Sequence, residues 1–208
     1  LTNTGDLAEL VQKLDADAPK NARGATTDTE IMTALIGLQD EKNVEASALA
    51  VLPKLEGAFS LVFMDERTLY AARDRHGVRP LVIGKLDRGW VVASESAALD
   101  IVGAAFVREV EPGEFLAINE DGIRSQMWAK PDPKGCIFEY VYLARPDTSI
   151  AGQGVHATRV RIGKRLAIEA PVEADLVIPV PESGTPAAIG YAQQSGIPYG
   201  LGLVKNSY

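Results

Sequence analysis

The spacing of apolar residues changes near residue 58 of this chain of 208 residues. Before that point apolar residues recur every three or four positions, which is typical of amphipathic helices. We expect helices over 6–14, after Thr27, and over 44–55. The segment Thr27-Asp28-Thr29-Glu30 resembles a helix N-terminal cap with acidic residues in the first turn.

Residues 58 to about 130 follow a different pattern, with short runs rich in β-branched and aromatic residues between tight turns. The predicted strands are 58–64, 68–72, 80–84, 89–93 and 114–118, with a brief helix over 95–101. The Asn119–Gly122 turn should return the chain as a hairpin. This part is therefore predicted to be an antiparallel meander beside helices, an α+β unit.

The composition of Lys130–Gly135 is that of a linker, and a third pattern follows it. We expect strands over 137–143, 175–180 and 199–204, with helices over 155–169 and 185–195 between them. Strands that alternate with helices indicate crossover connections and a parallel sheet. The fold class is thus α+β followed by the beginning of an α/β unit.

Composition excludes several classes of function. The 28 acidic and 21 basic residues give a net charge of −7, which argues against general nucleic-acid binding. One cysteine cannot form an internal disulfide, so a reducing, cytoplasmic setting is expected. No apolar run approaches the roughly 20 residues that cross a bilayer. Because the chain begins at Leu1 and ends soon after an apparent third strand, we expect it to be a piece of a longer protein.

The segment 175–192 is the most informative for chemistry. A Val- and Ile-rich strand stops at Pro181, and Glu182-Ser183-Gly184-Thr185 then opens a helix. Backbone N–H groups at such a position bind phosphates, although an ordinary turn with a Ser or Thr helix cap has the same sequence, and both interpretations stay open. Glu182 would repel a bare phosphate, so a magnesium–phosphate ligand that also contacts Ser183 fits better.

Other charged residues favour structural roles. The Arg73–Leu81 turn is expected to be a solvated hairpin in which Asp74 pairs with a neighbouring Arg. Asp28 lies at the positive end of its helix, and it could equally bind the ammonium group of a ligand. Cys136 is isolated and is expected to act as a small buried apolar residue. The basic residues of the helix over 155–169 are expected on a solvated face, namely Arg159, Arg161, Lys164 and Arg165.

Several blocks resemble the glutamine phosphoribosylpyrophosphate amidotransferases, and the likeness runs in order along the whole chain. The blocks are Leu1–Asn3, Ala98–Ala104, Cys136–Thr148, Pro179–Gly184 and Gly202–Tyr208. The resemblance implies a class II, N-terminal-nucleophile glutaminase with an antiparallel sandwich over 1–130. It also implies that 135–208 begin the parallel sheet of a type I phosphoribosyltransferase. Such enzymes convert phosphoribosyl pyrophosphate and glutamine to 5-phosphoribosylamine, glutamate and pyrophosphate in purine biosynthesis.

The resemblance also implies roles for single residues. Asp28 would hold the α-amino group of glutamine, and Glu182, Ser183, Gly184 and Thr185 would form the pyrophosphate loop, with Ser183 beside Mg²⁺. Lys205 to Tyr208 would open a mobile loop over the second substrate, although Ser207 replaces the more usual Arg. In members with an iron–sulfur cluster, Cys136 corresponds to one of four ligands; members without a cluster also have this Cys.

The resemblance places further parts of both sites outside this chain. The nucleophilic Cys is expected upstream of Leu1 and the ribose-binding acidic signature after Tyr208, so the chain alone is expected to be inactive. Purine nucleotide inhibitors, a homotetramer and a cytoplasmic location are implied for the intact enzyme. Two alternatives are a glutaminase that serves another synthase and a non-catalytic scaffold; the Pro181–Thr185 loop favours the phosphoribosyltransferase.

Overall fold

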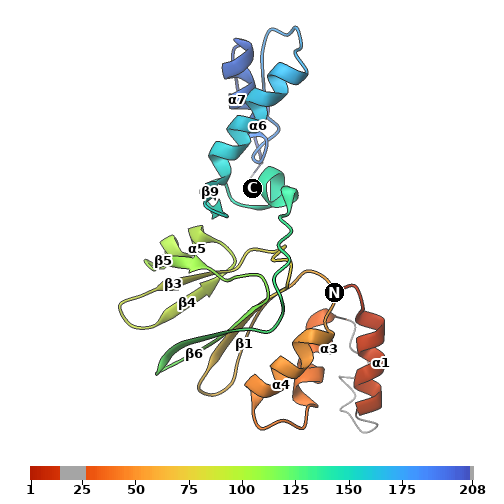
Figure 1. Cartoon of the computed structure of the whole chain (residues 1–208). Coiled ribbons are helices and arrows are strands. Elements are labelled where there is room, and N and C mark those ends of the chain that lie inside the picture. Colours follow the sequence, from red (N-terminus) through yellow and green to blue (C-terminus); the bar gives the residue numbers. More distant parts are fainter. Residues whose placement is uncertain (15–26, 207–208) are drawn as a thin grey trace. The chain divides into compact units, whose positions relative to one another are not determined.

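The computed structural model describes residues 1–14 and 27–206 (Figure 1). The chain divides into two compact units. The first consists of Leu1–Ser94 and Arg108–Gly135, and the second of Glu95–Val107 and Cys136–Tyr208. None of the helices in the described ranges is both long enough and apolar enough to cross a membrane.

The first unit begins with three helices, as the sequence predicts. They are α1 (Thr4–Leu14), α3 (Asp28–Gly37) and α4 (Val44–Val51), and a 3₁₀ turn, η1 (Leu52–Lys54), follows α4. Thr27 caps α3: its hydroxyl accepts from the Glu30 amide at 3.3 Å, and the Glu30 carboxylate accepts from the Thr27 amide at 3.2 Å. Helix α4 ends earlier than expected because Pro53 has no N–H and its ring crowds the preceding turn.

Two antiparallel sheets follow the helices. The larger has the order β1-β2-β6-β7, and its strands are β1 (Ser60–Met64), β2 (Leu69–Arg73), β6 (Glu114–Asn119) and β7 (Gly122–Met127). The second has the order β4-β3-β5, with β3 (Val82–Lys85), β4 (Trp90–Ala93) and β5 (Ala105–Glu109), of which only the last two residues lie in this unit. The hairpin at Asn119–Gly122 is confirmed, whereas β5 was not expected from the sequence.

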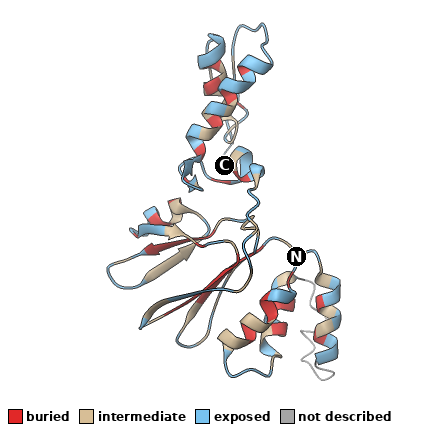
Figure 2. Ribbon diagram, in the orientation of Figure 1, coloured by how far each residue is buried: buried red, intermediate tan, exposed pale blue. Residues whose placement is uncertain are grey.

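The core lies on both faces of β2 and β6. Tyr70 and Phe115 point to one face and pack with apolar residues of α1, α3 and α4. Ala71 and Leu116 point to the other face and pack with Ile83 of β3. Neighbouring residues in a strand face opposite sides, so the two central strands are buried on both faces (Figure 2). This explains why β2 contains almost no polar residue.

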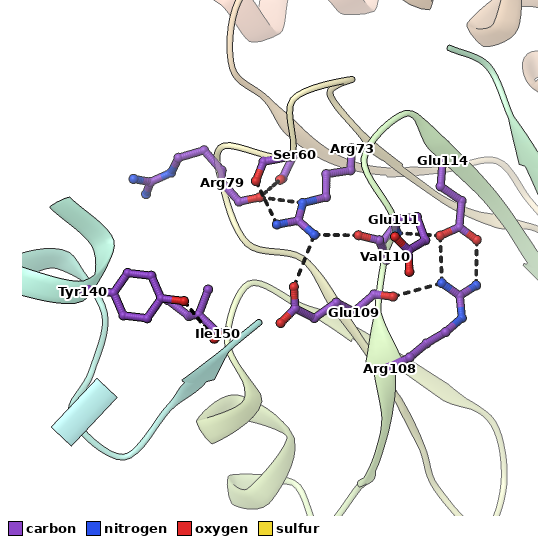
Figure 3. A network of polar contacts seen from close by, with 11 residues as sticks. Ser60, Arg73, Arg79, Arg108, Glu109, Val110, Glu111, Glu114, Tyr140 and Ile150 are labelled. Atoms are coloured by element: carbon purple, nitrogen blue, oxygen red, sulfur yellow. Dashed lines mark hydrogen bonds and ion pairs between the residues drawn. The ribbon is translucent and has the colours of Figure 1, made fainter. Parts of the chain in front are cut away.

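The Arg73–Leu81 turn is buried at its start, which corrects the expected solvated hairpin. Arg73 donates to the carbonyl oxygens of Val110 at 2.6 Å and of Gly77 and Arg79 at 2.9 Å (Figure 3). Asp74 accepts from the Phe59 amide and from the His76 amide, not from a neighbouring Arg. The turn therefore satisfies backbone groups at the ends of several strands, and the structural role is confirmed.

A second buried charge lies at the start of β6. Glu114 accepts from both terminal nitrogens of Arg108, at 2.6 and 2.7 Å, and from the Glu111 amide (Figure 3). It also accepts from the Ser125 hydroxyl. Burial alone would raise the pKa of Glu114, but these four hydrogen bonds outweigh it and hold the pKa below its ordinary value.

The second unit is mainly helical. It contains α5 (Ser96–Ile101), η2 (Glu139–Leu143), β8 (Ser149–Ile150), β9 (Gln153–Gly154), α6 (Val155–Glu169) and α7 (Thr185–Ser195). The strand expected over 137–143 is wrong, because this segment is helical and ends in a π-helical turn. The rings of Phe138 and Tyr142, four residues apart, stack with centroids 5.2 Å apart, a contact that a strand does not allow.

Helices α6 and α7 pack closely through glycines. A Cβ on Gly163 would lie 1.9 Å from the carbonyl oxygen of Ala187, and one on Gly190 would lie 2.0 Å from that of Val160. Arg159 of α6 is buried and donates to two backbone carbonyls of the 140–144 segment, so it is not on a solvated face as expected. Burial lowers the pKa of this guanidinium.

The two segments expected as further strands of this unit meet at a single parallel bridge between Val177 and Tyr199. The Val177 amide donates to Pro198, and the Gly200 amide donates back to Val177. The direction of this pairing agrees with the expected parallel sheet. The larger sheet itself stays a prediction.

Candidate functional site

Asp28 is the strongest candidate for a ligand-binding residue in the first unit. It is the first residue of α3, and one carboxylate oxygen accepts from the Thr4 hydroxyl at 3.0 Å. The other oxygen contacts the backbone nitrogen of Leu1. The side chain is 45% exposed, so the carboxylate is accessible to a ligand.

Hydrogen bonds to η1 and the residues after it fix the chain beside Asp28. The Thr2 amide donates to the carbonyl of Glu56 at 2.9 Å, and the Asn3 side chain donates to the carbonyl of Lys54 at 2.9 Å. Gly57 has a φ of +114°, and a Cβ there would lie 3.1 Å from the Thr2 nitrogen. The glycine therefore allows the two backbone segments to lie against each other.

A cavity of about 560 Å³ is lined in part by this segment. Its lining includes Thr2, Gly57, Phe59, His76 and Trp128. The ring of Trp128 stacks on Phe59, with centroids 5.9 Å apart. Thr2 is adjacent in sequence to Leu1, which contacts Asp28, so the cavity and the Asp28 carboxylate adjoin the same short segment.

The loop Glu182–Thr185 is the candidate site in the second unit. Gly184 is the N-cap of α7, and no side chain caps this helix, so the alternative interpretation of an ordinary turn with a Ser or Thr helix cap does not hold. The Gly184 amide donates to Val180, and the Thr185 amide donates to Glu182. A Cβ on Gly184 would lie 2.8 Å from the carbonyl oxygen of Val180, so a side chain at this position would distort the turn. The positive end of the α7 dipole, which no side chain caps, faces this turn and suits an anion, although Pro186 in the first turn has no N–H to donate.

The donors in this loop fit a magnesium ion that arrives with its ligand. The described residues contain no group of three His, Cys, Asp or Glu side chains that could hold a metal ion. Mg²⁺ is often bound by substrate phosphates and water, with one or two protein oxygens completing the shell. The Ser183 hydroxyl and the exposed Glu182 carboxylate could supply such oxygens.

Cys136 fits only part of an iron–sulfur site. It is a half-buried free thiol and the sole cysteine of the chain. Such a cluster needs several thiolates, usually four. Any cluster would therefore take its remaining ligands from outside these 208 residues.

The structure places the remaining candidates as follows. Lys205 is exposed in an irregular segment, and Tyr208 lies outside the described residues. Asp28 belongs to the first unit and the Glu182–Thr185 loop to the second. Thr4 was missed, because no local motif relates a residue in one helix to an acid 24 positions later in another.

Comparison with known proteins defines the class first. Residues 4–101 match the family model of the glutamine amidotransferase domain. The solved structure of glutamine phosphoribosylpyrophosphate amidotransferase from Bacillus subtilis, complexed with ADP and GMP, superposes with a TM-score of 0.91 at 40% identity. It covers the whole of this chain, which corresponds to 45% of that chain. The fold is therefore that of a glutamine amidotransferase.

Sequence similarity points to a particular enzyme within that class. Over its whole length the chain is 63% identical to an amidophosphoribosyltransferase of Mycobacterium tuberculosis and 62% identical to one of Mycobacterium leprae. The resemblance found in the sequence is thus confirmed: the chain is homologous throughout to amidophosphoribosyltransferases. It spans about 40% of the length of these curated relatives.

Proposed function

We propose that the chain is the central part of an amidophosphoribosyltransferase of purine biosynthesis. The intact enzyme would convert phosphoribosyl pyrophosphate and glutamine to 5-phosphoribosylamine, glutamate and pyrophosphate. The observation that carries the proposal is the 63% identity to such an enzyme over the whole chain, which includes both candidate sites. Residues 1–130 would belong to the glutaminase domain and 135–208 would begin the phosphoribosyltransferase domain.

In the glutaminase, Asp28 would bind the α-ammonium group of glutamine. The proposal is supported by its accessible carboxylate, which Thr4 holds by a hydrogen bond. A cysteine thiolate outside this chain would attack the side-chain amide, which gives a γ-glutamyl thioester and ammonia. Water would then hydrolyse the thioester to glutamate. The α-ammonium is remote from the reacting amide, so Asp28 contributes binding and orientation.

In the transferase, Glu182, Ser183, Gly184 and Thr185 would bind pyrophosphate. The N-terminus of α7, which no side chain caps, supports this, because the positive end of the helix dipole stabilises the negative charge that develops on the leaving group. Ammonia would displace pyrophosphate from C1 of the ribose. Magnesium, when bound with the substrate, neutralises part of the pyrophosphate charge, and Lys205 and Tyr208 would belong to a loop that covers the substrate.

Assembly and regulation extend the proposal to the intact enzyme. The related Bacillus subtilis structure is complexed with ADP and GMP, which supports purine nucleotides as inhibitors of this enzyme as well. We include a cytoplasmic homotetramer in the proposal, and we leave the iron–sulfur cluster as an option that depends on cysteines beyond this chain.

The test is the stoichiometry of the full-length enzyme. Glutamate and pyrophosphate should be released one to one when glutamine and phosphoribosyl pyrophosphate are supplied with Mg²⁺. Ammonium salts should replace glutamine in supporting pyrophosphate release. Glutamate release with no consumption of phosphoribosyl pyrophosphate would instead indicate a glutaminase that serves a different synthase.

A further inference from the structure

Thr4 lies in the first turn of α1, and its hydroxyl donates a hydrogen bond to the Asp28 carboxylate. We propose that Thr4 is a positioning residue for glutamine: its hydroxyl orients the Asp28 carboxylate that receives the substrate's α-ammonium group. This inference rests on the proposed function and adds to it a residue that acts through Asp28.

The hydrogen-bond geometry assigns the hydroxyl proton of Thr4. Its oxygen lies 3.0 Å from a carboxylate oxygen of Asp28 and 3.4 Å from the carbonyl oxygen of Leu1. A hydroxyl donates one proton, and the shorter contact to the charged acceptor is the stronger. Thr4 therefore donates to one oxygen of Asp28, while the backbone nitrogen of Leu1 contacts the other oxygen.

The surroundings of Asp28 explain why its carboxylate needs the hydrogen bond from Thr4. Its backbone is fixed because α1 and α3 pack through Leu7, Val11, Ile31 and Leu35. Its side chain, however, is 45% exposed and has no core packing to select a rotamer. A carboxylate that rotates in water must be ordered when substrate binds, which weakens binding. The Thr4 hydroxyl orders it in advance.

The expected effect falls on binding and not on chemistry. In glutamine the α-, β- and γ-carbons lie between the α-nitrogen and the carboxamide carbon. The α-ammonium group therefore does not take part in bond breaking. Loss of the hydrogen bond between Thr4 and Asp28 should therefore raise the KM for glutamine and leave kcat almost unchanged. The ammonia-driven reaction does not use this site at all.

The experiment compares three variants of the full-length enzyme. Thr4→Val removes the hydroxyl at nearly constant volume, and Thr4→Ser keeps it. Thr33→Val is the control, because Thr33 is an exposed residue of α3 whose hydroxyl donates only to the carbonyl of Thr29, at 2.8 Å. Steady-state kinetics are measured with glutamine and, separately, with ammonium chloride.

Thr4→Val should raise the KM for glutamine about three- to tenfold, as expected for one hydrogen bond to a partly exposed charged group, with kcat within about twofold. Thr4→Ser should return KM to within about twofold of the parent, and Thr33→Val should not change it. Ammonia-driven activity should be the same in all variants.

Three results would overturn the inference: an unchanged KM in Thr4→Val, no recovery in Thr4→Ser, or a parallel loss of glutamine- and ammonia-driven activity. Asp28→Asn separates this failure from failure of the proposed function. If Asp28→Asn raises KM but Thr4→Val does not, only the role of Thr4 is wrong. If the unmodified enzyme shows no glutamine-dependent activity, the proposed function fails as well.

Discussion

Replacing Glu114 with Gln removes one buried charge while nearly preserving side-chain shape. The carboxylate is 3% exposed and receives four hydrogen bonds, two on each oxygen. The Gln amide nitrogen can face the Ser125 hydroxyl, which can rotate to accept a hydrogen bond. The same nitrogen must then face a terminal nitrogen of Arg108, where two donors meet and one charge-assisted bond is lost.

The structure sets the size of the effect. A hydrogen bond to a charged group contributes about 1.5–3 kcal/mol, and the remaining bonds weaken when the charge is removed. Arg108 is 38% exposed and can turn partly to water, which limits the loss. We expect Glu114→Gln to lower the free energy of unfolding by about 3 kcal/mol, within the range for breaking buried ion pairs.

The effect should depend on pH in a defined direction. Because the pKa of folded Glu114 lies below its ordinary value of 4.5, ionisation stabilises the folded state above that pH. This stability is lost as the pH falls through the folded pKa. The difference between the parent chain and Glu114→Gln should therefore be complete at neutral pH and should shrink in acid.

Urea unfolding followed by tryptophan fluorescence measures this difference. The two tryptophans, Trp90 and Trp128, both lie in the first unit, so the signal reports the unit that contains Glu114. A loss of about 3 kcal/mol should lower the midpoint by about 1.5 M if the slope is about 2 kcal/mol/M.

Glu45→Gln is the matched control for this substitution. Glu45 pairs with Arg124 at 2.6 Å, the same distance as in the buried pair, but Arg124 is 64% exposed. The loss there should be below about 1 kcal/mol. Equal, small losses at both positions would refute the reasoning, because burial would then not decide the contribution of the charge.

Two further substitutions test the second unit. Gly163→Ala should lower the stability of the α6–α7 pair by about 3 kcal/mol or more, because the helices must separate, and thermal unfolding followed by circular dichroism measures it. Gly37→Ala, where the added Cβ has no neighbour within 4 Å, should leave stability unchanged or slightly higher; similar losses in both would contradict the close packing. Gly184→Ala should raise the KM for phosphoribosyl pyrophosphate on the order of tenfold in glutamine- and ammonia-driven assays of the full-length enzyme, since the loop must shift. An unchanged KM would remove the loop from the pyrophosphate site.

Local signals predicted much of the fold. The cap at Thr27–Glu30 and the hairpin at Asn119–Gly122 each depend on a few neighbouring residues, and both are confirmed. The helix over 137–143 could not be found in this way, because its aromatic and β-branched residues favour a strand by propensity. The stacking of Phe138 on Tyr142 appears only once the segment is helical.

Burial of charge was harder to predict. Arg73 and Arg159 look like surface residues in the sequence, yet both are buried and donate to carbonyls contributed by other segments. Those acceptors lie far away along the sequence or in irregular backbone, so no regular spacing of residues in the sequence identifies them. The same limit applies to the candidate site: the sequence suggested Asp28, whereas its partner Thr4 depends on how α1 packs against α3.

The central claim is that the two candidate sites serve two half-reactions of one enzyme, and Asp28→Asn tests it most directly. Pyrophosphate release by the full-length variant is measured with glutamine and with ammonium chloride as alternative nitrogen donors. We expect kcat/KM for glutamine to fall on the order of a hundredfold, because the ammonium group loses its charged partner, while ammonia-driven release stays within about twofold. Unchanged use of glutamine, or an equal loss with both donors, would contradict the account.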